Sequence, residues 1–428
     1  MYILNKKRNV TYYYTPILCF YLFTLICLYP FGVEIGGVSL RLSDLISLAL
    51  VLIGSIYLLK IGKVKKEIVL LLIIAPFFLM ELILPILGSL MHSDSFVVSS
   101  LKTIITYLPL IFLFIFYDNN SLTVLDKKIE NVLKVALITQ LIASLVQILV
   151  VFNYLPREFL IQEILEQWSV DHHYDAVDGV RASGLTNNGI ELSMIGILIF
   201  GYFLSKLNTD FRISYLIYVF SALTLIILST TRAAILAAVI IFLAHVLFSR
   251  TSFKSKVKTI TMLTTSILVL FFIISRYLGL EELFYRFIRI TEGGLTNDFS
   301  YNYRNEVLWP HVLEGLRSYP VGTLINPYNV FGVIDSGYLS YYAQGTFLFT
   351  IAFIILVIGC LFLGGVSVMK KTNVHHGLFL INIMIYVLIA MYFYNLMRLP
   401  IVIFFIMYAI ANIALCKKKE LYEGKMLK

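Results

Sequence analysis

The sequence predicts an all-α integral membrane protein with about 12 transmembrane helices, and its composition supports this class. Hydrophobic residues make up 59% of the 428-residue chain and charged residues 14%. The mean hydropathy is +0.88. A soluble globular chain carries about 25% charged residues, so the composition excludes an ordinary soluble fold. We therefore treat residues 1–428 as a single polytopic membrane domain.

Apolar stretches of spanning length recur along the chain. A spanning helix needs about 20 mostly apolar residues. Such windows lie at 16–33, 42–59, 68–90, 102–117, 132–152, 189–205, 213–229, 233–249, 259–275, 344–364, 377–394 and 399–416. An even number of spans places both termini on one side of the membrane.

The lysines set the orientation. With both termini in the cytoplasm, the cytoplasmic segments contain 23 of the 34 Lys and Arg residues. Positive charge is retained on the cytoplasmic side, so this orientation is the expected one. Two long loops then face outward, at about 153–188 and, between spans nine and ten, at about 275–343.

Arginine dominates the cations that remain outside. Arginine offers a planar, permanently charged fork for phosphate or carboxylate, whereas lysine suits a solvated topology signal. The outer cations are Arg41, Lys102, Arg157, Arg181, Arg232, Arg276, Arg286, Arg289, Arg304, Arg317 and Arg398. They indicate an anionic ligand on the outer face. Alternatively, single arginines pair with outer acids such as Glu281, Glu282 and Glu306.

The segment STTRAAILAA, 229–238, predicts a tight outward hairpin between spans seven and eight. Arg232 then lies at the outer membrane boundary, where the phosphate of a lipid-linked ligand would lie. The alternative is an arginine that snorkels from a helix end. Within the spans, Glu81 is an acid that faces an internal cavity or a basic residue.

The outer loops differ in what they offer. In the first loop, His172, His173, Asp175 and Asp178 lack the spacing of metal ligands, so we expect a solvated acidic loop and no metal site. The second loop is rich in aromatic side chains, which suit sugar rings and are also typical of an interfacial belt. Early in it, Arg289 shares a helical face with Arg286.

Three segments resemble the bacterial O-antigen ligase and polysaccharide polymerase superfamily. VRASGLTNNGIELSMI resembles its Arg-x-x-Gly segment, and STTRAAILAA its Ser-x-x-Arg segment at the outer hairpin. YRNEVLWPHVLEGLRSYPVG followed by DSGYLSYYAQG resembles its large-loop pattern, including an Arg-x10-Gly spacing from Arg304 to Gly315. Ligases of this superfamily typically place His-Asn before Tyr-Leu. This chain has Asp335-Ser336 there, which favours the repeat-unit polymerases.

The resemblance implies an integral-membrane glycosyltransferase of the bacterial plasma membrane. It would transfer a polyprenyl-pyrophosphate-linked glycan chain to a lipid-linked repeat unit on the outer face, building O-antigen or capsule. Its donor is already activated, so we expect no cofactor and a metal-independent reaction. Membrane lipid, a chain-length regulator and a flippase are implied as partners, and we expect no nucleic acid.

The resemblance also suggests site residues. Fixed cations would stabilise the pyrophosphate leaving group, and Arg232 and Arg181 come first for this role, followed by Arg304 and Arg289. Tyr338 would contact glycan.

The acceptor hydroxyl needs a general base. Asp335 is the first candidate and His311 the second, although Asp335 could instead cap the helix into span ten.

Two other functions stay open. One is ligase-type glycan transfer. The other is a transporter or a flippase of lipid-linked oligosaccharide. A transporter would usually show two similar halves and interrupted helices with polar residues near the midplane. The sequence shows no repeat between 1–210 and 211–428, and its polar residues concentrate in the outer loops.

Overall fold

The computed structural model describes most of the chain in two compact units. The described residues are 2–28, 32–35, 38–61, 72–92, 97–152, 154–156, 182–186, 188–248 and 299–426, with single positions between 257 and 276. The first unit comprises Met1–Leu25, Gly32–Glu130 and Arg304–Lys428, and the second comprises Ile26–Phe31 and Asn131–Tyr303.

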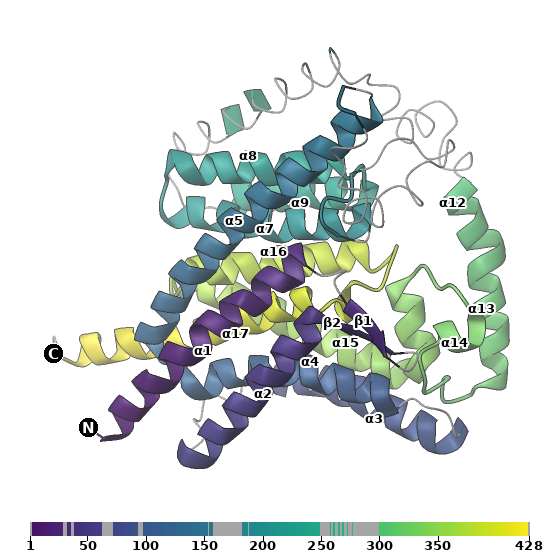
Figure 1. The fold of residues 1–428 in the computed structure, drawn as a ribbon, viewed down its shortest axis with the longest axis horizontal. Coiled ribbons are helices and arrows are strands. Elements are labelled where there is room, and N and C mark those ends of the chain that lie inside the picture. The colour runs from purple at the N-terminus through teal and green to yellow at the C-terminus, as the bar shows by residue number, and fades with distance from the viewer. Residues whose placement is uncertain are drawn as a thin grey trace. The chain divides into compact units, whose positions relative to one another are not determined.

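The first unit is mainly helical (Figure 1). Its elements are most of α1 (Tyr2–Cys27), β1 (Gly32–Ile35), β2 (Val38–Arg41), α2 (Leu42–Ile61), α3 (Ala75–His92), α4 (Val97–Phe116), the start of α5 (Asn119–Val151), η5 (Tyr303–Leu308), α13 (Trp309–Gly315), η6 (Leu316–Ser318), α14 (Tyr328–Phe331), α15 (Gly337–Met369), α16 (Val374–Ala390), η7 (Leu396–Arg398) and α17 (Pro400–Met426). The long helices α15, α16 and α17 follow one another and pack in that order.

A β-hairpin corrects the end of the first predicted span. The window 16–33 was expected to be helical throughout, but α1 ends at Cys27 and Gly32 already pairs with Arg41. Pro30 disfavours helix in the residue before it, and β-branched Val33 and Ile35 suit an extended strand. The protein is thus helical with one two-stranded antiparallel sheet among its described residues.

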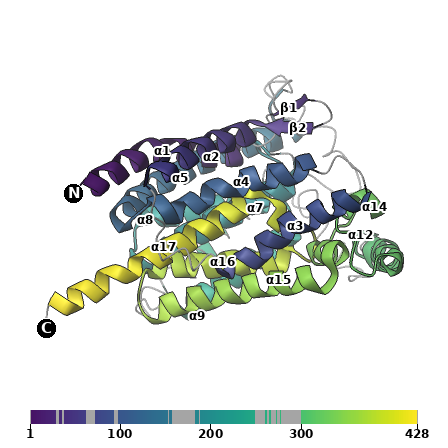
Figure 2. The same cartoon turned by 90° about the horizontal axis from the view of Figure 1, so that it is seen from below.

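α4 is central to the first unit. It packs against α2, α3 and α17, while α3 also packs against α15 (Figure 2). Tyr14 of α1 is fully buried and donates a hydrogen bond from Oη to the Pro109 carbonyl over 2.9 Å. Because Pro109 has no N–H, the Ile105 carbonyl one turn earlier lacks its helical donor, and Ser47 Oγ of α2 donates to it over 2.6 Å.

The second unit contains the rest of α5, then α7 (Gly189–Thr209), α8 (Ile213–Leu228), α9 (Arg232–Phe248) and α12 (Phe299–Asn302). α7 packs against both α8 and α9. Two buried glutamines of α5 fix the chain that leads into α7. Gln147 Oε1 accepts from the backbone N–H groups of Ser183 (3.0 Å) and Gly184 (2.8 Å), and Gln140 Oε1 accepts from Leu185 N over 2.8 Å.

Four helices are long and apolar enough to cross a membrane. These stretches are Leu42–Leu59, Asn119–Val151, Gly189–Thr209 and Gly337–Met369. Seven shorter apolar helices accompany them in the described residues. Such helices indicate a membrane protein. The number of about 12 spans and the orientation remain predictions, and the window 259–275 lies mostly outside the described residues.

Two glycines bring α15 and α16 into backbone contact. A Cβ added at Gly364 would lie 2.8 Å from the Gly377 carbonyl oxygen, and one added at Gly377 would lie 2.9 Å from the Gly364 oxygen. Small residues at such a crossing allow helices in an apolar environment to approach closely. Neighbouring Gly365 faces open space, with nothing within 4 Å of an added Cβ.

We therefore expect Gly364→Ala to lower the free energy of unfolding by about 1–3 kcal/mol, the usual cost of overpacking. Thermal unfolding of the purified protein in detergent measures the effect. Gly365→Ala is the matched control, since it adds the same methyl group one residue away without a contact. Equal stability of the two variants would contradict the close approach.

Candidate functional site

The predicted outer loop folds into helical turns just before α15. The π-helix η5 (Tyr303–Leu308) leads into α13, and Pro310 occupies an early position of α13, where its missing N–H is no cost. π-helical turns are rare and occur frequently at functional sites. Arg304 projects from this turn, and its surroundings define the candidate site.

Arg304 and Asp335 form an ion pair. Arg304 Nε donates to Asp335 Oδ2 over 3.1 Å, and the guanidinium carbon lies 5.7 Å from the centre of the Phe393 ring. The side chain of Arg304 is 18% exposed and that of Asp335 37%. Among the described residues, neither the Nη groups of Arg304 nor Oδ1 of Asp335 makes a further hydrogen bond. These atoms are available to a ligand.

Asp335 does not cap α15. The cap is Ser336, whose Oγ accepts from Leu339 N over 3.3 Å. The alternative that Asp335 serves as a helix cap is therefore wrong, and its carboxylate points to Arg304 because the next residue already satisfies the helix end. The N–H groups of Gly337 and Tyr338 both donate to the Met391 carbonyl, which fixes the start of α15 beside the end of α16.

An aromatic pocket of about 430 Å³ lies beside this pair. Its lining is mostly aromatic: Trp309, Tyr338, Tyr341, Tyr342, Phe353 and Tyr392, with Leu313, Ser336, Leu339 and Thr350. The rings of Trp309 and Tyr392 pack edge to face, with 5.2 Å between ring centres. Tyr338 donates from Oη to the Leu388 carbonyl over 2.6 Å, so its ring is held in place. Trp309 Nε1 is buried and has no hydrogen-bond partner among the described residues.

α15 is broken eight residues after its start. Gly345 (φ −141°, ψ 20°) and Thr346 (φ 48°, ψ −132°) leave the helical region. The carbonyls of Ala343 and Gln344 instead accept from the N–H groups of Thr323 (2.8 Å) and Leu324 (2.9 Å). A positive φ is unusual for a β-branched residue, and such backbone strain clusters at functional sites.

Gly322 allows the preceding loop to run against the backbone at the break in α15. Its φ is +86°, and an added Cβ would lie 2.6 Å from the Gln344 carbonyl oxygen. Its N–H donates to the Tyr319 carbonyl over 2.9 Å, which closes a turn over Tyr319–Gly322. The predicted span 344–364 is therefore the second half of a longer, kinked helix.

Arg398 links Gln344, at the break in α15, to Asn326 in the loop that precedes α15. Its Nη1 donates to Asn326 Oδ1 over 2.6 Å, and its Nη2 donates to Gln344 Oε1 over 2.8 Å. Glu81 of α3 is buried and lies close enough to Arg398 and Tyr341 for their charges to interact. Glu81, which the sequence predicted to face a cavity or a basic residue, therefore lies near the cation Arg398.

Tyr328 lies near both Arg398 and the Asp335 carboxylate of the Arg304–Asp335 pair. Its Oη donates to the Ile334 carbonyl over 2.7 Å. Burial raises the pKa of Tyr328, Arg398 lowers it and Asp335 raises it. The phenol is therefore a hydrogen-bond donor at neutral pH and holds the chain just before Asp335.

The remaining predicted residues are placed as follows. His311 is exposed on α13 and makes no hydrogen bond or ion pair with the described residues, so the structure does not bring it to Asp335. Arg232 is partly buried and begins α9 in the second unit. Arg181 and Arg289 lie outside the described residues.

The second unit brings together the neighbours of two predicted arginines. Ala182 N donates to the Leu228 carbonyl over 3.0 Å, and Thr231 Oγ1 donates to the Gly189 carbonyl over 3.3 Å. The residues that follow Arg181 therefore pack on the tight turn between α8 and α9. This turn confirms the helical hairpin predicted at 229–232.

Sequence reasoning missed Phe393, Asn326 and Gln344 as parts of these clusters. Phe393 and Asn326 are common loop residues without a spacing signal. Gln344 followed by Gly345, at the head of an apolar window, did carry a signal, since polar residues and glycine there indicate an interrupted helix. Comparison of the chain with protein-family models and with curated protein sequences finds no match.

Replacing Arg398 tests its network. Arg398→Leu removes both hydrogen bonds, leaves buried Gln344 without its donor and removes a positive charge near buried Glu81, so we expect a loss of about 1–3 kcal/mol in the free energy of unfolding. Adding Glu81→Gln to this variant should restore part of the loss, since no buried charge then remains uncompensated. Thermal unfolding in detergent measures both.

The control for this prediction is Arg317→Leu. Arg317 is an exposed arginine on η6, so its removal should change stability by less than about 0.5 kcal/mol. Additive effects of Arg398→Leu and Glu81→Gln would show that the two side chains do not interact.

Proposed function

We propose that the protein is a polysaccharide polymerase that acts on O-antigen or capsule repeat units. It transfers a polyprenyl-pyrophosphate-linked glycan to a lipid-linked repeat unit on the outer face of the bacterial plasma membrane. The observation that carries the proposal is the Arg304–Asp335 pair, whose remaining polar atoms are available beside an aromatic pocket. The resemblance of the three sequence segments to the polymerase superfamily supports it further.

The pair supplies the two groups that the transfer needs. Asp335 Oδ1 accepts the proton of the acceptor hydroxyl, whose oxygen then forms the bond to the anomeric carbon. The bond from that carbon to the phosphate oxygen breaks, and the pyrophosphate leaves with the electron pair. The Nη groups of Arg304 stabilise this developing charge. A direct displacement of this kind inverts the anomeric centre.

The aromatic pocket contributes glycan binding, and Arg232 of the second unit is a separate candidate for binding an anion. Aromatic rings such as Trp309 and Tyr338 offer flat surfaces to sugar rings, and the buried Nε1 of Trp309 is a donor for a sugar hydroxyl. Arg232 stands at the N-terminus of a 17-residue helix, where the helix dipole adds to its charge. The charge of Arg232 and the dipole of this helix end both suit an anionic lipid headgroup. His311 is a weaker candidate base because it is exposed and distant from these contacts.

A flippase of lipid-linked oligosaccharide is the second candidate function. One observation favours it: α15 is interrupted at Gly345–Thr346, near buried Glu81 and partly buried Arg398. Interrupted helices with buried charges are typical of transporters. Ligase-type transfer has no such observation in its favour, since the chain has Asp335-Ser336 where ligases typically have His-Asn.

The decisive experiment uses cells that lack the gene, complemented at matched expression, with surface glycan resolved by size. Wild type should restore a ladder of repeat units, while Asp335→Asn and Arg304→Ala should leave a single repeat unit. Loss of a general base lowers the rate by about 10²–10⁴-fold, enough to remove the ladder. Arg232→Ala tests the second unit in the same way.

Arg317→Ala is the control, because it removes an exposed arginine from the same loop. It should leave the ladder intact. A full ladder from Asp335→Asn would refute the assigned site. If cells without the gene lack even the single-unit product, and lipid-linked repeat units accumulate on the cytoplasmic face, the protein is a flippase. A lost single-unit product with normally exposed lipid-linked chains would indicate a ligase.

A further inference from the structure

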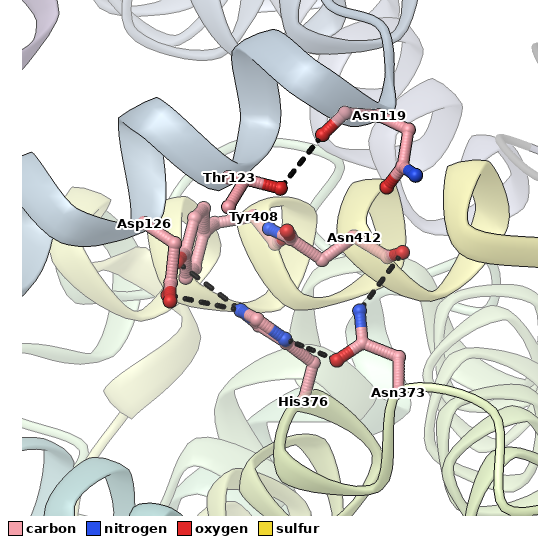
Figure 3. A network of polar contacts seen from close by, with 7 residues as sticks. All are labelled: Asn119, Thr123, Asp126, Asn373, His376, Tyr408 and Asn412. Atoms are coloured by element: carbon pink, nitrogen blue, oxygen red, sulfur yellow. Dashed lines mark hydrogen bonds and ion pairs between the residues drawn. The ribbon is translucent and has the colours of Figure 1, made fainter.

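A second polar cluster lies at the other end of α16, where α5, α16 and α17 meet (Figure 3). It contains Asp126 of α5 and the adjacent His375 and His376 of α16. One oxygen or nitrogen of each side chain lies within 4.8 Å of the others. The side chains are 15% exposed for Asp126 and 6% for His376. About 20 Å of α16 separates them from the Arg304–Asp335 pair, at 1.5 Å per residue.

The hydrogen bonds define which atoms of His376 carry protons. Asn373 Nδ2 donates to the Asn412 carbonyl over 3.1 Å, which orients the amide so that its Oδ1 faces His376 Nδ1 at 2.7 Å. This oxygen is only an acceptor, so Nδ1 must carry a hydrogen. In a neutral imidazole the other nitrogen, Nε2, then holds a lone pair.

Nε2 faces oxygen atoms as well. It lies 3.1 Å from Tyr408 Oη and 3.3 Å from Asp126 Oδ1 (Figure 3). The single hydroxyl proton of Tyr408 is donated to Asp126. A lone pair on Nε2 would therefore meet only oxygen lone pairs, and a positive charge is required between them. That charge is either a second proton on His376 or a metal ion.

We propose that His375, His376 and Asp126 form a binding site for a divalent transition-metal ion, with zinc as the best match. Two imidazoles and one carboxylate are a common zinc ligand set, completed by water or a further protein oxygen. Zinc bonds of about 2.0–2.1 Å in a tetrahedron hold two ligand atoms about 3.3–3.4 Å apart. The 3.3 Å between His376 Nε2 and Asp126 Oδ1 matches this spacing.

The second histidine distinguishes a metal ion from a proton. An imidazolium–carboxylate pair needs only His376, yet His375 is also buried, with 4.5 Å between the two ring centres. Both residues lie in the first turn of α16, and the Asp126 carboxylate offsets the positive end of the helix dipole for a bound cation.

The surroundings orient these ligands. A metal-binding histidine usually donates its other N–H to an oxygen that fixes the ring, and Asn373 Oδ1 has this position for His376. Asn373 itself adopts a left-handed conformation (φ 50°, ψ 51°), which asparagine tolerates better than most residues. Tyr408 donates to Asp126 and orients its carboxylate. A bound ion would join the three helices.

The site is independent of the proposed transfer. The segments around Asp126 and around His375 and His376 are both predicted cytoplasmic loops, whereas Asp335 lies in a predicted outer loop. A metal ion here would stabilise the helix ends and would not take part in the reaction, so the metal-independent mechanism is unaffected. Failure of one proposal leaves the other intact.

The test is a zinc titration of the purified full chain in detergent after removal of metals with a chelator. Calorimetry and elemental analysis should give one zinc ion per chain and a raised unfolding temperature. Asp126→Asn, His375→Gln and His376→Gln should each weaken binding more than about 100-fold, and Asn373→Ala about 10–100-fold, as for partners that orient ligands. His245→Gln, a buried histidine of α9, should bind zinc like wild type.

His375→Gln is the critical variant. It leaves the His376–Asp126 pair and Asn373 in place, so an imidazolium–carboxylate pair would remain, whereas a zinc site would lose a ligand. Unchanged zinc binding in this variant would overturn the proposal. So would a wild-type protein that binds no zinc in the titration; this result needs no variant to fold. Visible absorption of the Co²⁺-loaded wild type gives a second, variant-free readout of nitrogen and oxygen ligation.

Discussion

The break in α15 is the constraint on which the rest of the first unit depends. A helix that is interrupted in apolar surroundings exposes backbone carbonyls, and no water is available there to satisfy them. Thr323 and Leu324 supply the missing donors, and this requires the chain to run alongside the break. Gly322 is needed for that path, because any side chain would collide with the Gln344 carbonyl. Local backbone chemistry thus fixes the path of the loop segment that precedes α15.

The same arrangement positions the charged residues of the candidate site. Once the segment 322–327 is fixed, Asn326 and Gln344 present acceptors to Arg398. Tyr328 then holds the Ile334 carbonyl, so that Asp335 emerges immediately before the Ser336 cap and meets Arg304. The ion pair is partly exposed and contributes little to stability. Its significance lies in its remaining polar atoms, which make no further hydrogen bond among the described residues.

The two ends of α16 carry different polar chemistry. At its C-terminal end, Met391 accepts from the start of α15, next to the aromatic pocket. At its N-terminal end, Asp126, His375 and His376 gather side chains that are suited to a cation. Gly364 and Gly377 allow α15 and α16 to lie close enough for both arrangements. One helix pair therefore supports the proposed transfer site at one end and the proposed metal site at the other.

The sequence by itself determined the membrane class, most helix positions and the hairpin at 229–232, because apolar length and turn residues are local signals. It also selected Arg304 and Asp335 as candidates, though not as a pair. Only the tertiary structure decided that they meet, that Ser336 caps α15, and that Glu81, Arg398 and Gln344 share one network. These contacts join residues up to 317 positions apart (Glu81 to Arg398), and no local pattern encodes such distances. The β-hairpin at 32–41 and the break in α15 were missed for a related reason: apolar composition predicts burial, while the backbone conformation depends on glycine, proline and available hydrogen-bond partners.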